Sequence, residues 1–319
     1  MTRYDLQKNH KKSVRACLKN SPLYISSISL FIAFLLPCAL PAEGGPKPLY
    51  LEGAAAYQEF TEGGIKESIR LFKGARDEDP SFSPAYSSLA ESYIQLYYRS
   101  GETDAGLIRT AAGLAERALL ADARSPEAHK AIASVYFAEA RIEEAIEELE
   151  RAVDMKPEYA RAWLNLGTCW LELGEEEKGM RFFKRAIELD NDLLATALAY
   201  YNIASMQAGG KDHKGAAANY DRAASLLPGY YNIHYGKGIA LMNLGRDDEA
   251  VPVFEEAIRL KADYPAAHLA LASANHRLGE VPHAKKSYEA ALRLDPDLED
   301  AARGLAALQG KKLGCLFLY

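Results

Sequence analysis

The chain has 319 residues, a net charge of −6 and four cysteines. An acidic chain of this kind is poorly suited to binding nucleic acid, because it repels the phosphates. Four widely separated cysteines also give no disulfide framework of the kind that small secreted domains use.

The first 42 residues predict an export signal. Residues 1–20 carry six lysines and arginines against one aspartate, and an uncharged apolar run follows at 23–36. A basic start, a short apolar run and a small-residue exit at Ala42 are typical of a secretory signal peptide. The run is shorter than the roughly 20 residues that a spanning helix needs. We therefore expect an exported chain, periplasmic or extracellular, with a net charge near −11 once the +5 of residues 1–42 is removed.

Two alternatives for this segment stay open. Leu40 lies where a signal peptidase prefers a small residue, so residues 23–40 could remain as a membrane anchor. Cys38 could carry a lipid, although the preceding Pro37 is not the small residue that such a site prefers.

From residue 49 onward, small residues recur with a period of about 34. The three tracks are Ala75, Ala118, Ala152, Ala186, Ala223, Ala257 and Ala291; Ser68, Ala111, Ala145, Gly179, Ala216, Ala250 and Ala284; and Ala56, Ala90, Ala133, Gly167, Ala204, Gly238 and Ala272. A shared period of this length indicates stacked copies of one helical hairpin, each burying its apolar face against the next.

The copy at 160–193 shows the internal pattern. Trp163, Leu166 and Trp170 fall at helical spacing, and a second helical set follows around Phe183. Gly174 between the two sets predicts a left-handed turn that ends the first helix. The copy is therefore expected to fold as helix, tight turn, helix.

These residues resemble the tetratricopeptide repeat, and the resemblance covers roughly residues 49–298. In this copy the matching residues are Trp163, Leu166-Gly167, Trp170, Gly174, Gly179, Phe183 and Ala186, with Asn191 where proline is usual. The resemblance implies an all-α, right-handed α-solenoid of about seven hairpins. The expected parts are a linker at 43–48, repeats at 49–82, 83–125, 126–159, 160–193, 197–230, 231–264 and 265–298, a capping helix at 299–309 and an apolar tail at 310–319.

Two insertions interrupt the period. About nine extra residues lie between Ala90 and Ala111, and they predict either a longer first helix, with Thr103 capping the second, or a loop that contacts a partner. Three extra residues near 194–196 predict a longer lead into the fifth copy.

No catalytic or metal-binding motif is apparent, so we expect no enzyme activity, cofactor or metal. The glycines around Lys237 fall inside a predicted helix and cannot form a phosphate loop. The histidines His129, His234 and His268 share the repeat position of Trp163, which indicates interhelical packing. The acidic run Glu143, Glu144, Glu147 and Glu148 is expected to be a solvated helix face.

In the tetratricopeptide family the first helices line a concave groove. The resemblance places ten candidate peptide-binding residues there: Lys130, Ser134, Arg161, Asn165, Thr168, Tyr201, Asn202, Tyr235, Asn243 and His276. Asn165 and Asn202 hold equivalent positions, where side-chain amides can bond the backbone of an extended peptide. Tyr201 and Tyr235 are also equivalent and could pack on its side chains. The alternative is a solvated groove without a ligand.

Some members of the family hold a chaperone's C-terminal carboxylate in a clamp of lysines and asparagines. Lys130 and Asn165 match two positions of that clamp, whereas Ser134, Leu198 and Asn202 do not. We therefore expect a non-enzymatic scaffold that binds some other protein or peptide, in the cell envelope. The alternative is a membrane-anchored assembly component of a secretion or envelope machine.

Overall fold

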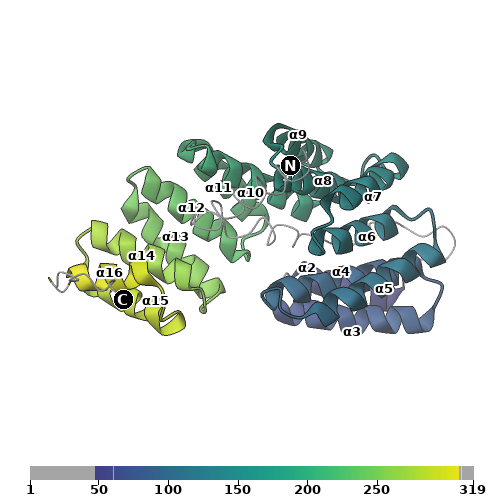
Figure 1. Ribbon diagram of the computed structural model, residues 1–319, viewed down its shortest axis with the longest axis horizontal. Coiled ribbons are helices and arrows are strands. Elements are labelled where there is room, and N and C mark those ends of the chain that lie inside the picture. The colour runs from purple at the N-terminus through teal and green to yellow at the C-terminus, as the bar shows by residue number, and fades with distance from the viewer. Residues whose placement is uncertain (1–46, 60, 309, 311–319) are drawn as a thin grey trace, which may run out of the picture. The chain divides into compact units, whose positions relative to one another are not determined.

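A computed structural model describes residues 47–59, 61–308 and 310 (Figure 1). Its helices are α2 (Pro48–Gln58), α3 (Glu62–Glu78), α4 (Ser83–Arg99), α5 (Ala105–Ala121), α6 (Pro126–Ala138), α7 (Ile142–Met155), α8 (Ala160–Glu172), α9 (Glu176–Leu189), α10 (Leu193–Gly209), α11 (His213–Leu226), α12 (Tyr231–Asn243), α13 (Asp247–Leu260), α14 (Pro265–Arg277), α15 (Val281–Leu294) and α16 (Glu299–Leu308). The described residues contain no strand. The chain divides into two compact units within α10, unit 1 ending at Leu198 and unit 2 starting at Ala199.

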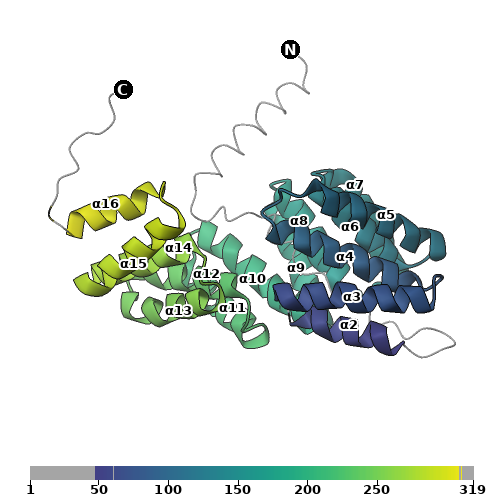
Figure 2. The ribbon, with the colours of Figure 1, turned by 90° about the horizontal axis from the view of Figure 1, so that it is seen from below.

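Each unit is built from consecutive antiparallel hairpins. In unit 1, α2 packs on α3, α4 on α5, α6 on α7 and α8 on α9, and each second helix also packs on the first helix that follows (Figure 2). Unit 2 repeats the arrangement with α12 on α13 and α14 on α15, and α16 covers α15. The predicted all-α fold of stacked helical hairpins with a terminal capping helix is confirmed.

The three small-residue tracks form the contacts between helices. All seven alanines of the first track are fully buried, from Ala75 to Ala291. A Cβ added at Gly167 would lie 2.6 Å from the Phe183 ring, and one at Gly238 would lie 2.4 Å from Phe254. The second helix of each hairpin thus lays an aromatic ring directly on the backbone of the first, which requires a small residue beneath it.

The turns follow the sequence in most places. Gly174 has φ +79° and ends α8 in the left-handed region, as predicted. The insertion in the second copy lengthens α4 to 17 residues. Thr103 does not cap α5, which was predicted as one possibility; Asp104 does, because its carboxylate accepts the Gly106 N–H at 2.9 Å while the Thr103 hydroxyl donates to the Ser100 carbonyl.

The second insertion is helical. The 17-residue α10 begins at Leu193, whereas α8, α12 and α14 each have 13 residues. The expected longer lead before the fifth copy is therefore wrong, because the extra residues extend the helix itself.

One repeat position tethers each first helix to the turn before it. Trp163 Nε1 donates to the Pro157 carbonyl at 2.8 Å, and the His234 and His268 rings bond the carbonyls of Pro228 and Ala262 at 2.7 and 3.0 Å. Tyr86 makes the same bond to Pro80. In every case the acceptor lies six residues earlier, so these rings fasten the helix entry as well as packing between helices.

The acidic face of α7 departs from expectation at one residue. Glu148 is buried, and its carboxylate lies 2.6 Å from His129 Nδ1 and pairs with Arg151. The prediction that it is solvated is wrong, because the same repeat position holds Leu114, Phe182 and Val253 and faces the hairpin interior. Cys169 is buried as expected, and burial raises the pKa of its thiol.

The predictions for residues 1–46 and 311–319 lie outside the described residues. Among the helices that the structure describes, none has the length and apolarity to cross a bilayer.

Candidate functional site

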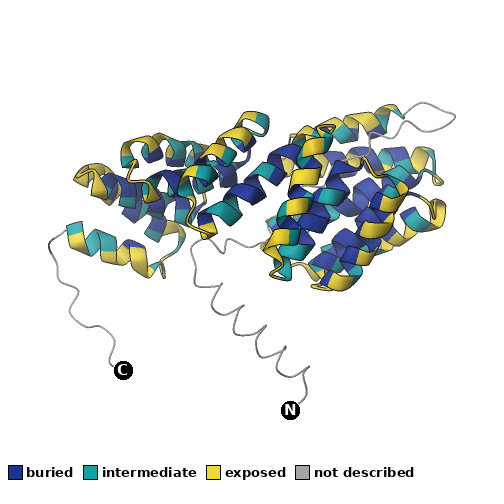
Figure 3. Ribbon diagram, turned by 90° about the horizontal axis from the view of Figure 1, so that it is seen from above, coloured by how far each residue is buried: buried dark blue, intermediate teal, exposed yellow. Residues whose placement is uncertain are grey.

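The predicted peptide-binding residues fall into both units and are mostly enclosed. Buried residues concentrate on the facing sides of the helices within each unit (Figure 3). The candidates of unit 1, all buried, are Lys130, Ser134, Arg161, Asn165 and Thr168. In unit 2, Tyr201, Asn202 and Tyr235 are buried, His276 is half-buried and Asn243 is exposed.

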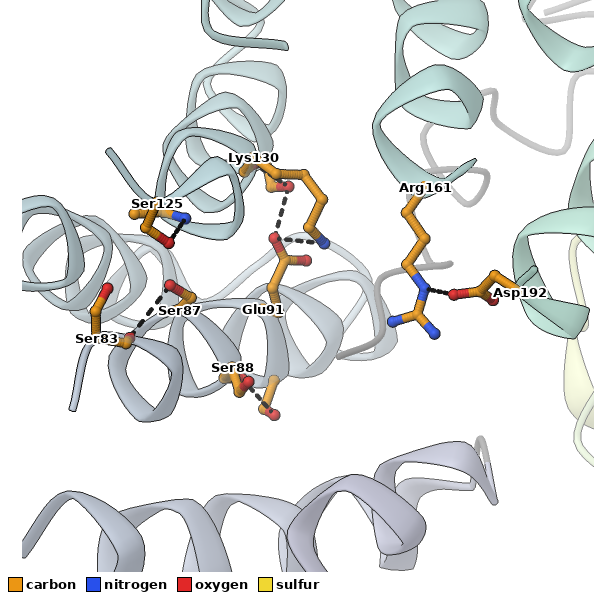
Figure 4. A network of polar contacts seen from close by, with 11 residues as sticks. Ser83, Ser87, Ser88, Glu91, Ser125, Lys130, Arg161 and Asp192 are labelled. Carbon is orange, nitrogen blue, oxygen red and sulfur yellow. Dashed lines mark hydrogen bonds and ion pairs between the residues drawn. The ribbon is translucent and has the colours of Figure 1, made fainter. Parts of the chain in front are cut away.

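The unit 1 candidates meet two carboxylates that were not predicted. We call Glu91, Lys130, Ser134, Arg161 and Asp192 the polar axis of unit 1. Glu91 on α4 and Lys130 on α6 point toward each other, with 3.2 Å between Oε1 and Nζ (Figure 4). Ser134 donates to the same carboxylate at 2.9 Å. The guanidinium of Arg161 on α8 pairs with Asp192, just before α10.

Burial removes water from these ion pairs, and this desolvation costs more free energy than it would for an ion pair at the surface. Burial raises the pKa of the Glu91 carboxyl, although Lys130 and Ser134 oppose the shift. Burial also lowers the pKa of Lys130 to about 8. Both shifts favour the neutral forms, so the loss of water outweighs the attraction between the two groups.

A tyrosine of helix α2 lies near the axis. Burial, and then the charge of Glu91, raise the pKa of the Tyr57 phenol, whereas the charge of Arg161 opposes that rise, so Tyr57 lies within electrostatic reach of both. Tyr50, on the same helix, lies within electrostatic reach of Tyr159 at the start of α8.

Several polar atoms in the interior of unit 1 have no hydrogen-bond partner among the described residues. They include Nδ2 of Asn165, Nη1 of Arg161 and Oε2 of Glu91. Buried polar atoms of this kind are uncommon, and each one costs about 1–3 kcal/mol when unsatisfied. Two donors and one acceptor are therefore open to a bound group.

The hydroxyls along the first helices are used locally. Ser134, Thr168, Ser205 and Ser273 each donate to the carbonyl four residues earlier, at 2.9–3.2 Å. Of the two predicted hydroxyl residues, Ser134 and Thr168, neither has its proton free for a ligand in this arrangement.

Unit 2 presents tyrosines in place of ions. We call Tyr201, Tyr220, Tyr230, Tyr235 and Tyr264 its tyrosine cluster. Ring centroids lie 5.7 Å apart for Tyr201 and Tyr230 and 5.1 Å apart for Tyr235 and Tyr264. Burial raises the pKa of Tyr220 and of Tyr235 to about 12. These phenols stay neutral and act as packing groups with one polar end.

Asn202 lies beside this cluster in the sequence and is fully buried. Neither amide atom of Asn202 has a hydrogen-bond partner in the part of the chain that the structure describes. His276 Nδ1 lies 3.4 Å from the Tyr288 hydroxyl, at the half-buried end of α14. Asn202 thus offers one donor and one acceptor, as Asn165 offers a donor in unit 1.

The sequence contained a signal for the burial that was missed. The repeat position of Lys130 holds Leu164, Tyr201, Tyr235 and Leu269 in other copies, which marks it as an interior position. A lysine there needs a buried counter-ion, and Glu91 is an acid on the preceding first helix. Across the described residues, no group of histidine, cysteine or acid side chains is arranged to hold a metal ion.

The fold and these repeat positions define a helical-hairpin repeat protein. A family model described as "Tetratricopeptide repeat" matches residues 130–193 and 235–299. The match covers part of each unit, and it agrees with the resemblance seen in the sequence.

Several curated proteins share parts of the sequence. "Protein STIP1 homolog" of Dictyostelium discoideum is 33% identical over 94 residues, 28% of this chain and 17% of that protein. "Superkiller protein 3" of Schizosaccharomyces pombe is 24% identical over 280 residues, 85% of this chain and 19% of that protein. The chain thus spans less than a fifth of the length of these two relatives.

Solved structures share the fold at low identity. A structure titled "Functional Characterization of Pseudomonas Aeruginosa pilF" superposes with a TM-score of 0.60 at 18% identity, covering 73% of this chain and 99% of that one. Yeast Tom70 gives a TM-score of 0.55 at 16% identity, covering 96% of this chain and 73% of that one. These likenesses concern the fold alone.

Proposed function

We propose that the protein is a non-enzymatic scaffold that holds an extended segment of a partner protein through its first helices. The observation that carries the proposal is the pair of equivalent asparagines, Asn165 in unit 1 and Asn202 in unit 2. Both are buried, and both keep amide atoms without a hydrogen-bond partner among the described residues.

A side-chain amide in such a position suits a peptide main chain. Its carbonyl accepts from a peptide N–H and its NH₂ donates to a peptide carbonyl, whatever the side chains of the partner. Recognition of this kind favours an extended segment over a folded surface. In unit 2 the partner's side chains would meet the edges of the tyrosine cluster at its most exposed members, Tyr201, Tyr235 and Tyr264, each 8% exposed.

The relatives support a binding role over a catalytic one. One matching protein is called "Hsp70-Hsp90 organizing protein" and another "DnaJ homolog subfamily C member 7". Two others are called "Protein O-mannosyl-transferase", and they match over about a fifth of their length. For this chain, a protein ligand and the lack of enzyme activity, cofactor and nucleic-acid partner remain part of the proposal.

The test removes the two amides together. Asn165→Ala with Asn202→Ala should change the free energy of unfolding by no more than about 1–2 kcal/mol, because the removal of unsatisfied amide atoms offsets the loss of buried volume. The same variant should lose partners that co-purify with the wild type from the native host. Glu147→Ala with Glu255→Ala, on exposed second-helix faces, is the control. Retention of every partner by the amide variant would defeat the proposal.

The location is proposed from the first 42 residues. A secretory signal would place the scaffold in the cell envelope, and an uncleaved segment 23–40 would make it an anchored assembly component of a secretion or envelope machine. Intact mass, N-terminal sequence and cell fraction of the native protein distinguish the two. A start near Glu43 in a soluble envelope fraction supports release, and an intact N-terminus in the membrane fraction supports anchoring. A lipid on Cys38 would contradict both.

A further inference from the structure

The charged groups of unit 1 restrict which segment it can hold. Each of three buried or half-buried cations there has a carboxylate of the same unit as its partner: Lys130 has Glu91, Arg161 has Asp192, and Lys156 has Glu127 at 3.0 Å. The side chains of Glu91 and Lys130 are 5% and 3% exposed, so water does not screen this pair.

Both carboxylates are fixed by further bonds. Glu91 accepts from Ser134, whose single hydroxyl proton is shared between this carboxylate at 2.9 Å and the Lys130 carbonyl at 3.0 Å. Asp192 accepts the backbone N–H groups of Leu194 and Ala195 at 3.1 and 3.0 Å, at the start of α10. An incoming carboxylate would have to displace a carboxylate that already has these bonds.

We infer that Glu91 and Asp192 are specificity-determining residues of unit 1, which act as built-in counter-ions so that its polar axis accepts an uncharged extended segment and rejects an acidic one. The inference rests on the proposed function. The open atoms fit an uncharged amide: Nη1 of Arg161 and Nδ2 of Asn165 donate to a main-chain carbonyl, and Oε2 of Glu91 accepts from a main-chain N–H.

An acidic side chain would meet the carboxylates of Glu91 and Asp192, whose side chains are 5% and 17% exposed. Like charges brought together in such a place cost several kcal/mol. Tyr57 of α2 is itself buried and lies within electrostatic reach of Glu91 and Arg161. The rejection of acids therefore applies to the part of a segment that reaches these two groups.

The test compares matched peptides. An array of short peptides with blocked ends carries each Asp- or Glu-containing sequence beside its Asn or Gln counterpart, and the full-length protein is bound to it. Wild type should prefer the neutral members. Glu91→Gln and Asp192→Asn, which keep the shapes and most hydrogen bonds, should shift the ratio toward acidic members by about tenfold or more. Glu67→Gln, in the exposed Arg70 pair, is the control and should shift nothing.

A second measurement is independent of peptide binding. Thermal unfolding is recorded in sodium acetate and in sodium chloride of equal ionic strength. The pH is kept well below the pKa of about 8 that Lys130 has beside Glu91, because the loss of that carboxylate lowers the pKa of Lys130 further. Acetate should stabilise Glu91→Gln selectively, because it replaces the lost counter-ion, and should leave wild type and Glu67→Gln unchanged.

The outcomes separate the two proposals. If the array binds no protein but acetate rescues Glu91→Gln, the peptide function fails and the counter-ion role stands. If wild type prefers acidic peptides, or if neither variant changes the ratio nor responds to acetate, the specificity inference is overturned while the scaffold function stands.

Discussion

Units 1 and 2 use one backbone plan and fill its inner positions with opposite chemistry. At the repeat position where unit 1 has Lys130, unit 2 has Tyr201 and Tyr235. In unit 1 burial shifts the pKa values of the Glu91–Lys130 pair toward the neutral forms. In unit 2 the buried groups are phenols that are already neutral, such as Tyr235. The small-residue tracks of the hairpins therefore determine the fold, whereas the inner positions can hold either charged or aromatic side chains.

The largest expected effect comes from breaking the ion pair of unit 1. Lys130→Met leaves Glu91 buried without its cation and should lower the free energy of unfolding by about 3–5 kcal/mol. Urea unfolding of the single variant and of the double variant Lys130→Met with Glu91→Leu checks this. The double variant should recover most of the loss, and an unrecovered loss would contradict the account of the pair.

The shared backbone plan is tested by Gly167→Ala in unit 1 and Gly238→Ala in unit 2. Each new Cβ would meet an aromatic ring, Phe183 or Phe254, closer than 3 Å. Both should therefore cost about 1–3 kcal/mol in urea unfolding. Gly113→Ala is the control, because its Cβ meets nothing within 4 Å on α5, and it should stabilise the protein by about 0.5–1 kcal/mol. A cost in only one unit would show that the units pack differently.

The pH dependence of stability should separate the units. The folded pKa of Lys130, about 8, lies below the ordinary value of 10.5, so the folded state releases this proton first. Between these values the unfolded state binds more protons, and stability therefore rises with pH, by up to about 1.4 kcal/mol per unit. Above about pH 10 the buried tyrosines have the opposite effect, because their pKa is higher in the folded state and stability then falls as the pH rises.

Urea unfolding between pH 8 and 9.5 measures this rise, which should vanish in Lys130→Met. Tyr235→Phe in unit 2 should leave the rise intact, because its pKa of about 12 lies above the range. A flat profile in the wild type would mean that Lys130 is not held as a buried cation.

The smallest effects concern the tether at the entry of each first helix. Trp163→Phe in unit 1 and His234→Phe in unit 2 each remove a ring N–H that bonds the carbonyl six residues back, and each should cost about 1 kcal/mol. Tyr200→Phe, at the same repeat position but packed on Arg222, should cost less. Equal losses at all three positions would argue against a role for the hydrogen bond.

The sequence predicted the hairpins well because their contacts are periodic. A ring such as Phe183 needs a small residue such as Gly167 beneath it, so the requirement recurs every 34 residues and is visible without a structure. The turn at Gly174 is local and was predicted for the same reason.

The candidate site was harder to predict because its contacts cross copies. Glu91, Lys130 and Arg161 belong to three different hairpins, and only their stacking brings them within electrostatic reach. Glu148 was misjudged because the local acidic run outweighed its apolar repeat position. A comparison of each polar residue with the residues at its repeat position in the other copies indicates the burial of both Lys130 and Glu148.

The most direct test of the central claim is site-specific photocrosslinking in the native host. A photoreactive residue is placed at Asn243 or His276, on the accessible part of the first helices of unit 2, or at Glu255 or Lys285 on its second helices. The account predicts that a partner protein is captured from the first-helix positions and not from the others. Capture from the second-helix positions alone would contradict it.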